Sequence, residues 1–106
     1  REEDGLAMSS RNTHLDSEER KVAPLLYQTL QQAAVIIQNN PKQNLEVLSQ
    51  NLTSQLNAVP QIKIDYLSFV NAESLQPVSQ FNGNVCLMVA AFVGNTRLVD
   101  NLLIQT

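Results

Sequence analysis

The stretch VCLMVAAFV (residues 85–93), with the Gly94-Asn95 pair and TRLVDNLLI (residues 96–104) that follow it, decides the fold of this chain. A short, continuous apolar run is typical of a buried central strand. A Gly-Asn pair between two such runs turns the chain tightly, as in a β-hairpin. The sequence therefore predicts that residues 85–93 pair with residues 96–104 as antiparallel strands.

A third strand is predicted upstream, in IKIDYLSFV (residues 62–70), where apolar and polar residues alternate. The residues expected on one face are Ile62, Ile64, Tyr66 and Val70. The other face is partly apolar as well, because it carries Leu67 and Phe69. A loop with a turn at Asn82 and Gly83 separates this strand from the hairpin. The three strands together predict a small antiparallel sheet.

Two helical patterns precede the strands. Asp16 is the predicted N-cap of the first helix, and Glu19 three residues later completes a capping-box pattern. Pro24 lies inside this pattern and cannot donate a backbone hydrogen bond, which predicts a kink or a short helix that runs into a longer one. The apolar residues at helical spacing are Val22, Leu26, Leu30, Ala33 and Ile37.

The second helix is expected to begin with Asn40 as its N-cap and Pro41 at its first position. Its apolar stripe consists of Leu45, Leu48, Leu52 and Leu56. Helices joined by so short a link are expected to lie antiparallel. The predicted fold class is α+β, with two to three helices packed on a small three-stranded antiparallel sheet.

The totals indicate one compact domain: the chain has 106 residues, of which 43% are apolar and 16% charged. Its net charge of -3 argues against broad nucleic-acid binding, which needs a basic face. The chain contains no signal peptide and no apolar span of about 20 residues, so we expect no membrane contact and a cytoplasmic location. Cys86, the single cysteine, cannot form an internal disulfide and is expected to be buried and unreactive.

The segment GLAMSSRN (residues 5–12) gathers hydrogen-bond donors and contains no acidic residue. Ser9 and Ser10 offer hydroxyls, successive backbone amides add donors, and Arg11 adds a planar guanidinium. Converging donors of this kind are what a phosphate group needs. The same pattern also fits an ordinary capped surface loop, so both interpretations stay open at this point.

Four blocks of the sequence together resemble the C-terminal domain of the pantoate–β-alanine ligase family. They are REEDGLAMSSRN, the spaced pattern L…EER…A…LY…L, IDYLSFVNAESLQPV and VAAFVGNTRLVDNLL. The resemblance extends over essentially all 106 residues, and the blocks occur in the family's order. It implies that residues 1–106 are the lid domain of a longer enzyme, and that an N-terminal nucleotide-binding domain is absent from this chain.

The resemblance also implies a reaction. In the family, ATP and pantoate form pantoyl adenylate and pyrophosphate with the help of Mg²⁺. The amine of β-alanine then attacks the adenylate and gives pantothenate and AMP. Since the active site lies between the two domains, the expected partners are these substrates and the N-terminal domain, and residues 1–106 alone are expected to be inactive.

Within this resemblance, Met8, Ser9, Ser10 and Arg11 correspond to the family's ATP-binding segment. Arg11 would stabilise the charge that develops on the phosphates during reaction, and is the predicted catalytic residue. The lysines of the related KMSKS loop are replaced here by Ala7 and Ser10, so Arg11 would supply this segment's positive charge alone. No residue of this chain is predicted to ligate the metal.

The remaining polar residues are assigned structural roles. His14 is expected on the surface, Tyr27 in the core with its hydroxyl at the edge, and Asp65 in a strand. Arg97 and Asp100 could form an internal ion pair, and both are left as structural residues. The acidic run Glu2–Asp4 is expected to be solvated or to pair with nearby bases; alternatively, Asp4 fixes the turn before Gly5. The alternative function is a non-catalytic module that docks on a partner protein.

Overall fold

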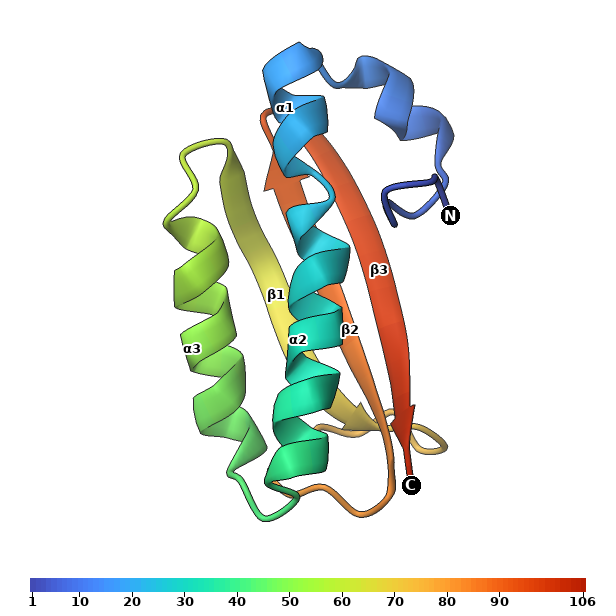
Figure 1. Ribbon diagram of the computed structural model, residues 1–106, viewed down its shortest axis with the longest axis vertical. Helices are drawn as coiled ribbons and strands as arrows, with labels where there is room; N and C mark the ends of the chain where they lie inside the picture. The colour runs from blue at the N-terminus through green and yellow to red at the C-terminus, as the bar shows by residue number, and fades with distance from the viewer.

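Two long helices cover one face of a three-stranded antiparallel sheet in the computed structural model, which describes residues 1–106 (Figure 1). The α+β class predicted from the sequence is therefore confirmed. The elements are η1 (a 3-10 turn, Ser10–His14), α1 (Ser17–Val22), α2 (Leu25–Asn39), α3 (Leu45–Asn57), β1 (Ile62–Asn71), β2 (Asn84–Val93) and β3 (Thr96–Gln105). None of the helices combines the length and the apolar character that a membrane span requires.

The predicted hairpin forms between β2 and β3. Val93 pairs with Thr96, which leaves Gly94 and Asn95 as a two-residue turn. Gly94 has a φ of 61°, and a left-handed backbone at the first turn residue is what glycine tolerates best. The strand order is β1-β2-β3, so the apolar run in β2 occupies the centre of the sheet as expected.

The predicted facing of β1 is wrong in its second half, because the register with β2 shifts between Ile64 and Tyr66. A bulge adds one residue to the strand and reverses which face the following side chains occupy. Leu67 and Phe69 therefore join Ile62 in the core, whereas Tyr66 is 40% exposed on the outer face of the sheet. Val70 pairs with Cys86 on that same outer face.

Pro24 separates two helices, as the sequence predicted: α1 ends at Val22 and α2 begins at Leu25. The capping box at the start of α1 is confirmed. The Asp16 side chain accepts from the Glu19 amide at 2.8 Å, and the Glu19 carboxylate accepts from the Asp16 amide at 3.0 Å.

The start of α3 differs from the prediction. Asn44 is the N-cap, its side chain accepting from the Val47 amide at 3.1 Å, while Asn40 ends α2. The Leu45 amide also donates to the carbonyl of Ser79 at 2.8 Å, which ties the true helix start to the β1–β2 loop. The link between the helices remains short, and α2 and α3 lie antiparallel (Figure 1).

The core lies between the helices and the inner face of the sheet, in one cluster of 20 buried residues. Both predicted stripes point into it, apart from Val22, which is only partly buried at its margin. The members from the helices and the α1–α2 junction are Ala23, Leu26, Leu30, Ala33, Ile37, Leu45, Leu48, Leu52 and Leu56. The inner-facing residues of β2 are Val85, Leu87, Val89, Ala91 and Val93.

Cys86 was expected in the core but is half-buried on the outer face, where it pairs with Val70 of β1 and Leu103 of β3. Alternation along β2 explains this position, since the side chains on either side of Cys86 point inward. Burial raises the pKa of the Cys86 thiol above its ordinary value. The protonated thiol is a weak nucleophile, which agrees with the expected lack of reactivity.

Candidate functional site

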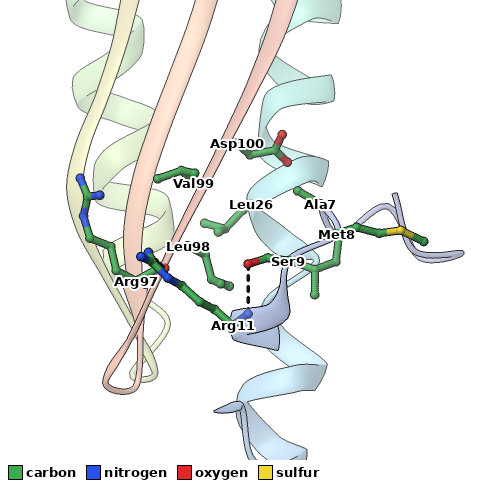
Figure 2. Close-up of a pocket in the computed structure, with 10 residues that line it drawn as sticks. Ala7, Met8, Ser9, Arg11, Leu26, Arg97, Leu98, Val99 and Asp100 are labelled. Atoms are coloured by element: carbon green, nitrogen blue, oxygen red, sulfur yellow. Dashed lines mark hydrogen bonds between the residues drawn. The ribbon is translucent and has the colours of Figure 1, made fainter. Parts of the chain in front are cut away.

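A cavity of about 340 Å3 opens between the N-terminal segment and β3 (Figure 2). The segment runs along the free edge of this strand (Figure 1). The lining residues are Leu6, Ala7, Met8, Ser9, Arg11, Leu26, Arg97, Leu98, Val99 and Asp100. Three of the four predicted ATP-binding residues thus line one cavity, and Ser10 is the one that does not.

A tight turn at Gly5 leads into the site. The Gly5 amide donates to the carbonyl of Glu2 at 3.0 Å, and the Glu2 amide donates to the carbonyl of Leu6 at 2.8 Å. Gly5 has a φ of 93°, which an L side chain rarely adopts. Leu6 is 3% exposed and anchors the segment in the core. The residues that follow are therefore held at the surface from a fixed point.

Asp4 stabilises this turn from outside, as predicted. Its Oδ1 accepts from the Leu6 amide at 3.3 Å, and its carboxylate pairs with Arg20 of α1 at 2.7 Å. The hydrogen bonds from Arg20 lower the pKa of Asp4 below its ordinary value. The Asp4 carboxylate is thus already paired with a basic side chain of the same chain.

The two serines have different surroundings. The Ser9 Oγ accepts from the Arg11 amide at 3.1 Å and caps η1, but its own proton stays available for donation. Ser10 is exposed, and its carbonyl accepts from the Thr13 hydroxyl at 2.8 Å. Both hydroxyls can therefore donate to an anion without breaking the fold of the segment.

Arg11 carries a positive charge that no carboxylate neutralises. None of the four ion pairs in residues 1–106 involves it. Its guanidinium donates a single hydrogen bond, 3.3 Å long, to the carbonyl of Arg97 at the edge of β3 (Figure 2). Because this contact is long and exposed, an anion with better geometry would readily replace it.

Met8 is 68% exposed and points away from the other labelled side chains in Figure 2. His14 is exposed in η1, as expected, and shares a shallow polar depression with Arg11. That depression contains no apolar residue and is completed by Asn95, Thr96 and Arg97. Donor groups therefore lie on both sides of the Arg11 side chain.

The predicted pair between Arg97 and Asp100 does not form. Successive residues of a strand point to opposite faces, so an odd spacing of three places these two side chains on different sides of the sheet. Arg97 instead pairs with Asp65 at 3.0 Å on the outer face. Asp100 pairs with Arg1 at 2.7 Å.

Sequence reasoning missed two residues of the site, Arg1 and Asn12. Asn12 Nδ2 donates to the carbonyl of Ala7 at 3.0 Å and closes the loop across Met8 to Arg11. Arg1 stacks on Tyr27, with its guanidinium carbon 3.8 Å from the ring centroid. Tyr27 is consequently half-buried beneath Arg1 rather than wholly in the core. One feature of the sequence could have indicated the role of Arg1. Because Arg97 and Asp100 face opposite sides of the sheet, Asp100 needs a different basic partner.

The family resemblance implies a magnesium ion, which the side chains of this chain do not fit. Mg²⁺ takes oxygen ligands in near-octahedral geometry. No three His, Cys, Asp or Glu side chains of residues 1–106 lie close enough together to hold a metal ion.

Comparison with known proteins identifies the family. The family model described as "Pantoate-beta-alanine ligase" matches residues 1–103. The pantothenate synthetase of Caldicellulosiruptor saccharolyticus is 43% identical over 105 residues, covering 99% of this chain and 37% of its own length. That of Thermosipho africanus is 42% identical over 104 residues, covering 98% of this chain and 37% of its own length. The chain thus spans little more than a third of these relatives.

Solved structures agree with this assignment. Pantothenate synthetase from Thermus thermophilus superposes with a TM-score of 0.84 at 38% identity, covering 100% of this chain and 38% of that one. The ligase from Francisella tularensis, complexed with beta-gamma ATP and beta-alanine, gives a TM-score of 0.55 at 26% identity, covering 97% and 30%. The chain therefore belongs to the pantoate-beta-alanine ligase family.

Proposed function

We propose that residues 1–106 form the C-terminal lid domain of an ATP-dependent ligase that condenses pantoate with β-alanine. The Met8–Arg11 segment contacts the triphosphate of ATP in this proposal. One observation carries it: Arg11 presents an unneutralised guanidinium beside a cavity, on a segment with two free hydroxyl protons and no acidic residue. Membership in the ligase family supplies the reaction.

The segment would act on charge that develops during adenylate formation. The pantoate carboxylate attacks the α-phosphorus of ATP, the bond to the bridging oxygen breaks, and the electron pair leaves on pyrophosphate. Arg11 would donate two parallel hydrogen bonds to the phosphate oxygens, and the serine hydroxyls would add others. Each hydrogen bond to a charged group contributes roughly 1.5–3 kcal/mol. Bonds that strengthen as the leaving group gains charge lower the barrier.

Other parts of the reaction are assigned to the remainder of the protein. The magnesium ion, when bound, would help to neutralise the phosphates, but its ligands would lie outside residues 1–106. The groups that hold pantoate and β-alanine would lie on an N-terminal domain outside residues 1–106. This chain's own part is to grip the phosphates and to cover the site.

Replacing Arg11 by alanine in the full-length enzyme is expected to slow pyrophosphate release from ATP and pantoate at least tenfold, or roughly 1.4 kcal/mol in the barrier. The reason is the loss of the segment's only positive charge. Coupled-assay rates for Arg11→Ala and Arg11→Lys measure the effect, and the lysine variant should be intermediate because it lacks the planar fork. Lys42→Ala, an exposed charge in the α2–α3 link, is the matched control. Near-normal rates for Arg11→Ala would rule out a role for this segment.

The chain of residues 1–106 alone is expected to bind ATP only weakly and to release no pyrophosphate. Half of the proposed site would be missing, so only a few phosphate contacts would remain to offset the loss of ligand freedom. Calorimetric titration with ATP measures this directly. A dissociation constant in the micromolar range would contradict the proposed division of the site.

A second candidate function is docking on another protein surface, because the outer face of the sheet bears apolar side chains. Tyr66, Phe92, Val99 and Leu103 are between 36% and 53% exposed there. An apolar face on a small domain marks a surface that a partner covers. The rest of the ligase would also fit this role, so an unrelated partner is favoured only if the full-length protein leaves this face open and lacks ligase activity.

A further inference from the structure

The Arg1 side chain donates four hydrogen bonds, more than any other side chain in the structure. Its Nη1 lies 2.7 Å from Asp100 Oδ2 and its Nη2 lies 2.8 Å from Asp100 Oδ1, which is a bidentate pair. The Asp100 side chain is only 7% exposed. Hydrogen bonding to Asp100 raises the pKa of Arg1 above its ordinary value. The pair is therefore shielded from water on the carboxylate side.

The same guanidinium joins three elements. Nη1 also donates to the carbonyl of Gly5 at 2.9 Å, and Nη2 to the carbonyl of Asn101 at 3.3 Å. The two terminal nitrogens of arginine carry four protons, so each proton has an acceptor. The guanidinium also stacks on the Tyr27 ring of α2. Arg1 thus connects the Gly5 turn, the edge of β3 and α2, and we name Arg1, Tyr27 and Asp100 the latch.

The stretch from Arg1 to Arg11 contacts β3 at both of its ends, and the two contacts differ in their number of hydrogen bonds. At the Arg11 end there is one exposed hydrogen bond of 3.3 Å to the carbonyl of Arg97. At the Arg1 end there are four hydrogen bonds and a stacked ring. Both arginines contact backbone carbonyls at the free edge of β3. The Arg1 end is therefore tied to β3 by more contacts than the end that carries Ser9, Ser10 and Arg11.

The latch differs from the Arg97–Asp65 ion pair in its burial and in the backbone that it contacts. Exposed ion pairs contribute about 0–1 kcal/mol, and Arg97 with Asp65 on the outer face is a pair of that kind. The latch instead has a nearly buried carboxylate and a backbone acceptor, Gly5, only three residues before Met8. Its hydrogen bonds therefore determine where the phosphate-binding segment starts.

We propose that Arg1, Tyr27 and Asp100 are positioning residues that hold the Met8–Arg11 segment in the orientation from which it grips the phosphates of ATP. This inference rests on the function proposed above. Asp100 lines the same cavity, but both of its carboxylate oxygens accept from Arg1, so the latch would act on ATP through the segment. When it is broken, only a fraction of molecules present the segment correctly, and the apparent affinity for ATP falls by that fraction.

The test uses the full-length enzyme and the variant Asp100→Asn, which keeps the shape of the side chain and removes its charge. KM for ATP is expected to rise about tenfold, while kcat stays within about twofold, because Arg11 still reaches the phosphates once ATP is bound. Amide hydrogen exchange of residues 2–12 without ATP is expected to accelerate. Glu18→Gln breaks an exposed pair with Lys21 in α1, away from the cavity, and should change neither quantity.

Two further variants guard against misfolding. Arg1→Lys keeps the charge but loses the bidentate contact, and should raise KM by a smaller factor; Asp100→Glu restores a carboxylate and should recover most of the ATP affinity. Circular dichroism of each variant checks that the sheet is intact. In an Arg11→Ala enzyme kcat should fall instead. This difference distinguishes a residue that contacts the phosphates from residues that orient the segment.

The measurements can also contradict the proposal, and each contradicting result points to a different part of it. Faster exchange in Asp100→Asn with an unchanged KM would overturn the positioning role, and unchanged exchange would overturn the latch itself. A wild-type enzyme that releases no pyrophosphate from ATP and pantoate would overturn the proposed function together with the positioning role. The exchange rates would still decide whether the latch orders the segment.

Discussion

Leu30→Ala is expected to lower the free energy of unfolding of residues 1–106 by roughly 3–5 kcal/mol. Leu30 lies in the middle of α2, is completely buried, and belongs to the cluster between the helices and the sheet. Alanine would lose the transfer free energy of three carbon atoms and leave a cavity that two rigid layers cannot close. The total free energy of unfolding of such a domain is about 5–15 kcal/mol, so a large share of its stability would be lost.

Urea denaturation followed by circular dichroism measures this change. Val35→Ala on the same helix is the control, because Val35 is 55% exposed and its truncation removes little buried surface. Its expected effect is below about 1 kcal/mol. Equal effects of the two substitutions would show that α2 does not pack on the sheet through the face that carries Leu30.

Gly5→Ala is expected to cost about 2–4 kcal/mol, either in global stability or in docking of the N-terminal segment. A Cβ at Gly5 would overlap the Tyr27 ring, lying 3.0 Å from Cε2 and closer still to Cδ2. The backbone φ of 93° adds strain of its own. Tyr27 cannot yield easily, since Arg1 stacks on it. Displacing the ring would disturb the latch and the position of the segment together.

Gly83→Ala is a matched control for this substitution. Gly83 has nearly the same φ, 91°, but a Cβ there would meet only the Thr106 hydroxyl, 2.9 Å away at the end of the chain. The control therefore carries the backbone strain without the clash against an aromatic ring. Unfolding experiments and hydrogen exchange of residues 2–12 compare the two. If Gly83→Ala proves as damaging as Gly5→Ala, contact with Tyr27 is not what fixes Gly5.

Much of the fold followed from local patterns. The hairpin at Gly94, the capping box at Asp16 and the break at Pro24 each depend on a few neighbouring residues, and all are confirmed. The bulge near Asp65 was missed because an extra residue in a strand is set by pairing with β2, which alternation cannot record. The start of α3 was misplaced because both Asn40 and Asn44 suit an N-cap, and a tertiary contact of Leu45 decides between them.

The candidate site shows the same division. The donors of Ser9, Ser10 and Arg11 are consecutive in sequence, so their grouping could be predicted. The pairing of Arg1 with Asp100 joins residues 99 positions apart, and only the folded chain brings them together. The pairing of Arg97 with Asp100 was wrong because it was inferred from their closeness in sequence. Alternation along the strand places the two side chains on opposite faces, where they pair with Asp65 and Arg1.

The contact between Arg1 and Asp100 has a consequence for how the chain matures during synthesis. A ribosome releases residues in order, and a domain folds once its interacting parts have emerged. The acceptors of Arg1 at Asp100 and Asn101 lie in β3, the last strand of residues 1–106, and only the Gly5 carbonyl is made early. The nascent polypeptide thus cannot form the contact between Arg1 and Asp100 until translation of this region is nearly finished, and a product truncated before β3 would never form it.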